Sequence, residues 1–176
     1  MYILVVGGGK VGLQLARVLS GDGHEILVIE RDRDRCGLLC DRLEESAVVL
    51  GDGTDPRLLR RCGIERADAV VAVTGKDEVN FVISHLAKKT FGVARVVARV
   101  NNPDNESIFN LLDLGSVVNS TNLILAVLNE ELHIGHLVKL FSLGRGQVEL
   151  VEVDLLSTSD VVGKEIRDIP LPEKTV

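Results

Sequence analysis

Residues 2–12 read Tyr-Ile-Leu-Val-Val-Gly-Gly-Gly-Lys-Val-Gly, an apolar run that leads into the spacing Gly7-x-Gly9-x-x-Gly12. In a strand that turns into a helix, the first glycine permits the tight turn, the second lets a ligand approach the backbone, and the third lets helix and strand pack closely. The next apolar run ends about twenty residues on, in Glu30, which can accept hydrogen bonds from ribose hydroxyls. The pattern predicts a helix N-terminus that binds the phosphates of an adenine nucleotide. Glycines that serve only a tight turn are the less favoured alternative.

Strand-like apolar runs recur at regular intervals, at Tyr2–Val6, Glu25–Ile29, Ala47–Leu50, Ala69–Val73, Arg95–Arg99 and Ser116–Asn119. The segments between them have helical periodicity. Asp55-Pro56 and Asn102-Pro103 each place a capping side chain before a proline suited to the first helical position, so a helix is expected to begin at both. Strands that alternate with helices in this way form right-handed βαβ units. The sequence therefore predicts an α/β fold, a Rossmann-type doubly wound sheet of six parallel strands in the order 3-2-1-4-5-6.

The pattern changes after the sixth strand. Thr121–Leu140 is rich in leucine and is expected to form one long helix, and Gln147–Leu155 alternates apolar and charged residues as a half-exposed strand does. A short helix is expected around Val161–Ile166. We predict a nucleotide-binding domain over residues 1–140, then a linker and the incomplete start of a small subdomain over residues 141–176.

Composition narrows the class of protein. The 176 residues suffice for one domain, and a core without Trp, with one Tyr and four Phe, must consist mainly of Val, Leu, Ile and Ala, as buried parallel strands require. The formal net charge of −6 argues against nucleic-acid binding. No apolar run approaches the roughly 18 residues that a membrane span needs, and the first residues lack the basic region of a signal peptide. A cytoplasmic protein that does not insert into the membrane is expected.

The cysteines and histidines give weaker signals. Cys36, Cys40 and Cys62 are an odd number in a chain without a secretory signal, so free thiols in a reducing compartment are expected. Cys36 and Cys40 have helical spacing that would suit a metal or an oxidant sensor, but buried core thiols are the favoured interpretation. His133 and His136 could share a metal, although no third ligand is evident, and a role at a helix end or an interface is favoured.

Further candidate site residues follow the later strands. Gly51-Asp52-Gly53-Thr54 closes the third strand, where Asp52 either accepts a hydrogen bond from the adenine amine or simply forms a turn before the helix cap. Thr74 and Gly75 leave the fourth strand at the topological switch point, where ligands bind in such sheets. Arg99 ends the fifth strand at the same edge, where a guanidinium can bind phosphate oxygens, although an exposed arginine there is unremarkable by itself.

The acid at position 30 also bears on the choice of cofactor. A carboxylate at that point repels a 2′-phosphate, which favours NAD or a plain adenine nucleotide over NADP. Arg31 follows it directly and is able to accommodate such a phosphate, but it is expected in solvent within the charged run Arg31–Arg35. NADP is therefore the second choice.

Taken together, several motifs resemble those of the TrkA-like family, also called RCK or KTN. They are Gly7–Gly12, Glu30, Gly51–Thr54, Ala72–Thr74 with Asp77, Glu78 and Asn80, and Ala98–Asn101. The resemblance covers roughly residues 1–140. Glu149–Val153, Ser159–Lys164 and Leu171-Pro172 resemble the start of the family's C-terminal subdomain, RCK-C, which is normally longer by several tens of residues.

The resemblance implies a cytosolic regulatory subunit that binds NAD(H), ATP or ADP and gates a potassium transporter or channel, its membrane partner. It implies a phosphate loop of Gly7, Gly8, Gly9, Lys10, Val11 and Gly12, with Lys10 at a variable position that is basic in some ATP-responsive members. It also places Glu30 at the ribose, Asp52 and Thr54 at the adenosine, Thr74 and Gly75 in the crevice, and Arg99 at phosphate. Family members form homodimers and often rings. The late helix carries apolar residues that would suit such a surface, although burial in the core explains them equally well: Leu123, Ile124, Val127, Leu128 and Leu132.

The rival hypothesis is an NAD-dependent oxidoreductase that lacks its substrate domain. Against it, the only tyrosine is Tyr2, so no Tyr-x-x-x-Lys pair exists, and no His or Lys stands clearly at a strand end as a general acid or base. A purely structural assembly subunit is a third class. The sequence favours a nucleotide sensor that is not an enzyme.

Overall fold

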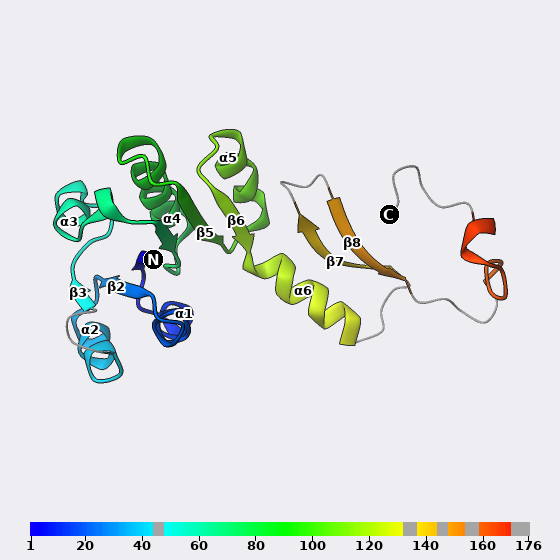
Figure 1. Ribbon diagram of the computed structural model, residues 1–176, viewed down its shortest axis with the longest axis horizontal. Helices are drawn as coiled ribbons and strands as arrows, with labels where there is room; N and C mark the ends of the chain where they lie inside the picture. Colours follow the sequence, from blue (N-terminus) through cyan, green and yellow to red (C-terminus); the bar gives the residue numbers. More distant parts are fainter. Residues whose placement is uncertain (44–47, 132–136, 144–147, 154–158, 170–176) are drawn as a thin grey trace. The chain divides into compact units, whose positions relative to one another are not determined.

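A computed structural model describes residues 1–43, 48–131, 137–143, 148–153 and 159–169. The chain forms two compact units, Met1–Asn122 and Leu123–Val176. The first unit contains one parallel sheet of six strands in the order β3-β2-β1-β4-β5-β6 (Figure 1). Its strands are β1 (Tyr2–Val6), β2 (Glu25–Glu30), β3 (Val48–Leu50), β4 (Ala69–Ala72), β5 (Arg95–Val100) and β6 (Ser116–Asn119). The predicted fold class and strand order are confirmed.

Helices connect these strands on both sides of the sheet. They are α1 (Lys10–Gly21), α2 (Arg33–Cys40), α3 (Pro56–Arg61), α4 (Asp77–His85) and α5 (Glu106–Leu111). A sixth helix, α6 (Ser120–Glu131), follows β6. Short 3₁₀ turns cover Ile64–Arg66 and Pro103–Asn105, and a π-helical turn, Leu86–Thr90, extends α4.

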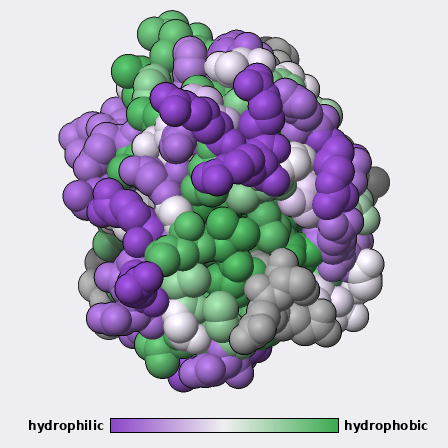
Figure 2. Space-filling model, turned by 90° about the vertical axis from the view of Figure 1, so that its left-hand side faces the viewer, coloured by the Kyte–Doolittle hydropathy of each residue, from purple (hydrophilic) through white to green (hydrophobic). Residues whose placement is uncertain are grey.

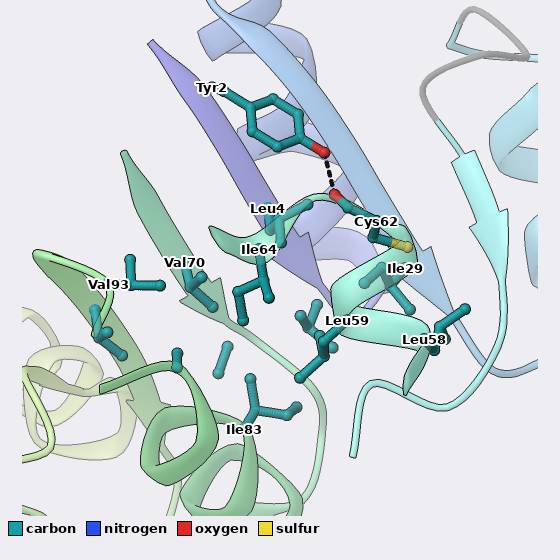
Figure 3. Close-up of a cluster of buried hydrophobic side chains, with 14 residues drawn as sticks. Tyr2, Leu4, Ile29, Leu58, Leu59, Cys62, Ile64, Val70, Ile83 and Val93 are labelled. Atoms are coloured by element: carbon teal, nitrogen blue, oxygen red, sulfur yellow. Dashed lines mark hydrogen bonds between the residues drawn. The ribbon is translucent and has the colours of Figure 1, made fainter. Parts of the chain in front are cut away.

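Alternation along β1 divides the core into two layers. Ile3 and Val5 pack with Ala16 of α1 and Leu39 of α2 on one side of the sheet. Leu4 and Val6 belong to the layer on the other side, which α3 and α4 cover (Figure 3). Because successive side chains of a strand point to opposite faces, a strand buried on both faces must be apolar at every position, and all five residues of β1 are buried.

Both predicted helix starts are confirmed. The Asp55 side chain accepts a hydrogen bond from the N–H of Arg57 and caps α3. The Asn102 side chain accepts one from the N–H of Asp104, and here the first turn is 3₁₀ before α5 begins.

The region after β6 corrects two predictions. The long helix expected over Thr121–Leu140 ends at Glu131 as α6, and Leu137–Leu143 is instead a strand, β7, paired antiparallel with β8 (Val148–Val153). The strand expected over Gln147–Leu155 is confirmed as β8. The helix expected around Val161–Ile166 is wrong, because this stretch forms turns through Gly163, whose φ is +81°, and only a 3₁₀ turn follows at Ile166–Asp168.

The face of the first unit that carries α2 and α3 is mixed in character. Hydrophilic side chains frame a hydrophobic area in its lower middle part (Figure 2). Leu38 of α2 and Leu50 of β3 are exposed to 58% and 43%. Ala47, which was expected to begin the third strand, lies outside the described residues.

Candidate functional site

A cavity of about 1030 Å³ opens at the carboxyl ends of the strands, where the chain connections of β1 and β4 diverge. The loops after β1, β2, β3 and β4 contribute to its wall, together with Arg99 near the end of β5. Of the twelve predicted site residues, nine line it: Gly7, Gly9, Lys10, Val11, Glu30, Asp52, Thr74, Gly75 and Arg99. The other three, Gly8, Gly12 and Thr54, do not line it. The structure therefore brings most of the predicted residues to one place.

Each glycine of the turn has a different environment. Gly7 has φ of +110°, and a Cβ there would lie 2.8 Å from the backbone nitrogen of Thr74. A Cβ on Gly12 would lie 1.9 Å from the carbonyl oxygen of Gly7. A Cβ on Gly9, by contrast, would meet nothing within 4 Å. The first and third glycines are therefore required by the fold, whereas Gly9, which lines the cavity, has open space beside it.

No side chain of the described residues caps α1, which begins directly after Gly9. The N–H groups of its first turn have no intrahelical acceptor, as in every α-helix, and here no capping side chain replaces one. They carry partial positive charge at the cavity wall, and the side chain of Lys10 lines the same cavity. This end of α1 can stabilise a bound anion.

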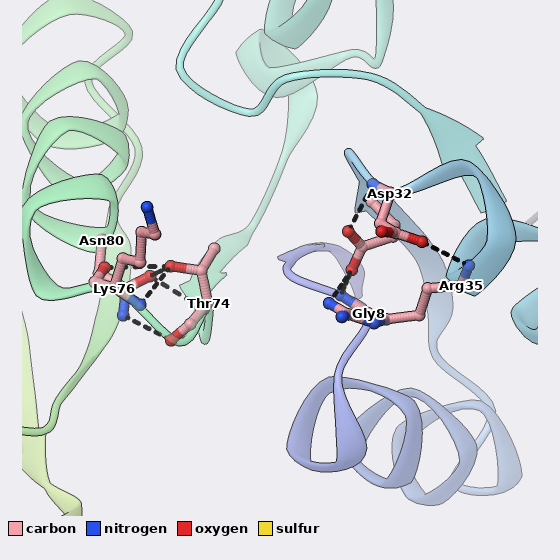
Figure 4. A network of polar contacts seen from close by, with 7 residues as sticks. Gly8, Asp32, Arg35, Thr74, Lys76 and Asn80 are labelled. Carbon is pink, nitrogen blue, oxygen red and sulfur yellow. Dashed lines mark hydrogen bonds and ion pairs between the residues drawn. The ribbon is translucent and has the colours of Figure 1, made fainter.

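Glu30 is only 6% exposed, and its buried carboxylate is bonded to neighbouring groups. One oxygen accepts a hydrogen bond from the N–H of Gly8 at 2.7 Å, and the other accepts one from Asp32 at 2.8 Å (Figure 4). Arg35 of α2 lies 3.5 Å from the first oxygen. Glu30 thus fixes the glycine turn to β2, a role that the sequence analysis missed when it assigned this acid only to the ribose.

Asp52 forms the turn that was one of its two expected roles. Its Oδ1 accepts hydrogen bonds from the backbone N–H of Thr54 at 2.9 Å and from the Thr54 hydroxyl at 2.7 Å. These bonds, the backbone one first, lower the pKa of Asp52. Its Oδ2 has no hydrogen-bond partner among the described residues, and Asp52 also lines the cavity. Contact with the adenine amine stays a prediction.

Asn80 organises the opposite wall. Its side chain is fully buried and accepts hydrogen bonds from the N–H of Thr74 at 2.9 Å and from the Thr74 hydroxyl at 2.6 Å (Figure 4). Its amide nitrogen donates to the carbonyl oxygens of Thr74 and Arg99, at 3.2 and 2.7 Å. Asn80 therefore ties the end of β4 to the end of β5, the two places that carry Thr74 and Arg99.

Asp77 continues this network at the start of α4. Its carboxylate accepts four hydrogen bonds, from the N–H groups of Asn101 and Asn102 and from the side-chain amides of Asn101 and Asn105. Burial by itself would raise the pKa of Asp77, but these donors outweigh it and lower the pKa. Asp77 and Asn80 entered the sequence analysis only through the family resemblance, and the structure shows the bonds that make them necessary.

Charge around the cavity is predominantly positive. Three acids line it, Glu30, Asp32 and Asp52, and each accepts hydrogen bonds from neighbouring backbone N–H groups. Six cations line it: Lys10, Arg31, Arg33, Arg35, Lys76 and Arg99. Arg31 is exposed, as expected, but it also lines the cavity. In a chain of net charge −6, this concentration of cations gives the cavity a local positive charge, which favours anions.

The remaining candidates form no second site within the described part of the chain. Cys36, Cys40 and Cys62 are free, Cys36 and Cys62 are buried, and burial raises the pKa of both. Among the described residues, no three or more His, Cys, Asp or Glu side chains are grouped to hold a metal ion. His133 and His136 lie outside those residues. Within the described chain, every helix is too short or too polar to cross a bilayer.

Comparison with known proteins agrees with this geometry. The family model described as the TrkA-N domain matches residues 3–120. The Trk system potassium uptake protein TrkA of Mycobacterium tuberculosis is 40% identical over 173 residues, which cover 98% of this chain and 78% of that protein. The Trk system potassium uptake protein TrkA homolog of Methanothermobacter thermautotrophicus is 33% identical over 176 residues, with 100% and 80% covered.

A solved structure of GsuK bound to ADP superimposes with a TM-score of 0.63 at 26% identity, over 76% of this chain and 34% of that one. The match of the family model covers more than half of the chain and includes the whole glycine turn, Glu30 and both walls of the cavity. On these grounds the chain belongs to the TrkA-N domain family.

Proposed function

We propose that this chain is a regulatory nucleotide sensor of a potassium uptake system, and that it binds NAD(H) or ATP/ADP in the cavity between the glycine turn and Arg99. The open space beside Gly9 carries this proposal. Glycine is used there although a Cβ would meet no atom within 4 Å, and Gly9 lines the cavity. A diphosphate that approaches the first N–H groups of α1 needs that space.

The wall divides into parts that suit different parts of such a ligand. Glu30 keeps unused lone pairs for ribose hydroxyls, since each of its oxygens accepts only one backbone hydrogen bond. Asp52 keeps Oδ2 for an adenine amine. Lys10, Lys76 and Arg99 supply positive charge for the phosphates. The ADP of GsuK is a ligand of this chemical class.

Calorimetric titration with ADP, ATP, NAD⁺, NADH and adenosine tests the proposal. The G9A variant tests the space beside Gly9, because the added methyl group meets no protein atom within 4 Å. We expect binding by the unmodified chain and a loss of at least tenfold in affinity for the phosphate-bearing ligands in G9A. If well-folded protein gave no heat of binding with any of the five ligands, the proposal would be refuted.

In our proposal the signal is a shift in population. Different nucleotides favour different arrangements of paired subunits, and a membrane-bound potassium transporter or channel responds to the change. Moving such a switch from mostly one state to mostly the other requires differential binding of about 5.5 kcal/mol.

We further propose that the chain acts in the cytoplasm as a homodimer or a ring, bound to the inner membrane face through its partner. Residues 141–176 begin the RCK-C subdomain in this proposal. Native mass spectrometry gives the subunit number and identifies any nucleotide that copurifies.

The oxidoreductase alternative predicts a different outcome. It requires sustained turnover of NADH with an oxo acid or an aldehyde, abolished by substitution of Arg99. A sensor shows saturable binding without turnover. Incubation of the chain with NADH and a panel of such substrates distinguishes the two.

A further inference from the structure

Arg99 connects the cavity to the first turn of α6. Its side chain lines the cavity, and its Nε donates a hydrogen bond to the hydroxyl oxygen of Ser120 at 3.2 Å. Ser120 is the first residue of α6. Both residues are half-buried, which limits competition from water for this bond.

The Ser120 hydroxyl is itself held in place. It lies 3.3 Å from the carbonyl oxygen of Val100 and 3.3 Å from Oδ1 of Asn101, so its proton is directed at the end of β5. A lone pair is then left to accept from Arg99. The next residue, Thr121, donates through its hydroxyl to the carbonyl oxygen of Asn101 at 2.5 Å. The first turn of α6 is thus bonded to the residues that follow Arg99.

The backbone of Arg99 is fixed as well, since its carbonyl oxygen accepts a hydrogen bond from Asn80 at 2.7 Å. With the main chain and Nε both engaged, the guanidinium has little rotational freedom. Its two terminal nitrogens make no hydrogen bond to any described residue, and together they carry four N–H groups. That edge of the fork is the one that binds two phosphate oxygens at once.

We propose that Ser120 is a positioning residue for the phosphate site. It holds Arg99 by Nε so that the terminal nitrogens point to the ligand, and the same guanidinium then joins the bound phosphate to the first turn of α6. The inference rests on the proposed function and adds to it the route by which occupancy of the cavity reaches α6. Because linkage is reciprocal, whatever stabilises the contact between Arg99 and Ser120 also favours the bound nucleotide.

Titrations of four proteins with ADP and with adenosine test this role. In S120A, the affinity for ADP is expected to fall roughly fivefold, the value of one ordinary hydrogen bond, while the affinity for adenosine stays unchanged because it has no phosphate. S120T keeps the hydroxyl and is expected to restore ADP binding. S107A is the matched control, since Ser107 is exposed on α5 and bonds only to the carbonyl oxygen of Asp104.

A double-mutant cycle completes the test. In an R99A background, S120A should cause no further loss of ADP affinity, because the group that Ser120 positions is gone. Equal losses of ADP and adenosine affinity in S120A, or full additivity with R99A, would overturn the positioning role while the proposed function stands. If the unmodified chain binds none of ADP, ATP, NAD⁺, NADH and adenosine, the proposed function and this inference fail together.

Discussion

The N–H of Gly8 donates a hydrogen bond of 2.7 Å to the buried carboxylate of Glu30. The acid that ends β2 therefore holds the middle of the turn that follows β1. The same carboxylate accepts from the N–H of Asp32, which leads into α2. One side chain thus sets the spacing between two neighbouring loops of the cavity, independently of any contact with a ligand.

This relationship predicts that E30Q changes stability as well as binding. A glutamine amide has a single acceptor oxygen, so one of the two backbone donors, on Gly8 or Asp32, loses its partner. The free energy of unfolding is expected to fall by about 1–3 kcal/mol, and ADP and adenosine should both bind more weakly. Urea unfolding and calorimetry measure the two effects. E78Q, at an exposed position of α4, is the control and should match the unmodified chain, whereas unchanged stability in E30Q would show that these bonds are dispensable.

The glycine turn gives a second prediction, in which stability and binding separate. G12A places a Cβ 1.9 Å from a backbone oxygen that cannot move freely, so we expect a loss of about 1–3 kcal/mol of unfolding free energy together with binding. G9A meets no protein atom within 4 Å and should cost about 1 kcal/mol or less as a poorer helix cap. Its nucleotide binding should nevertheless fall at least tenfold. Thermal unfolding with and without ADP compares the pair, and normal ADP binding by G9A would show that the ligand does not use this space.

Asn80 supplies a third prediction. N80A removes the acceptor for the N–H of Thr74 and the donor for the carbonyl oxygen of Arg99, both in a buried place. Leaving such groups unpaired is expected to lower the free energy of unfolding by about 2–4 kcal/mol. N110A, on the exposed side of α5, is the matched control and should lie close to the unmodified chain. Chemical unfolding of both variants is the measurement, and equal stabilities would contradict the role assigned to Asn80.

Local patterns explain why so much of the first unit could be predicted. Three kinds of signal each act over a few neighbouring residues: the apolar run of β1, the glycines after it, and the capping residues Asp55 and Asn102 before a proline. The strand order follows from the regular alternation of strands and helices. The bonds of Asn80 could not be predicted in the same way. The bonds depend on the position of the Thr74 and Arg99 carbonyl oxygens, which come close to each other only when β4 and β5 pair in the folded sheet.

The leucine-rich stretch after β6 shows the opposite case. Thr121–Leu140 satisfies a helical pattern throughout, yet its last residues belong to β7. Their antiparallel partner, β8, lies further along the chain, so the pairing that selects a strand is not visible within the stretch itself. The bond between Glu30 and the glycine turn could not be predicted for a related reason, since Gly8 is 22 residues away in sequence.

Asp77 yields the last prediction, a dependence of stability on pH. Burial would raise the pKa of its carboxyl, but four hydrogen bonds to the ionised form outweigh this and lower the pKa in the folded state. A depressed pKa means that the stabilisation is complete above the unfolded value of about 3.9 and is lost as pH falls through the lower folded value. D77N removes the charge at every pH, so its deficit in unfolding free energy should be full at neutral pH and should shrink below about pH 4. Urea unfolding at pH 7 and pH 3 measures this deficit, with D104N at an exposed position as the control that should show none. A deficit of the same size at both values would mean that D77N acts through altered packing, and that the carboxylate's charge contributes nothing to holding the segment after β5 against α4.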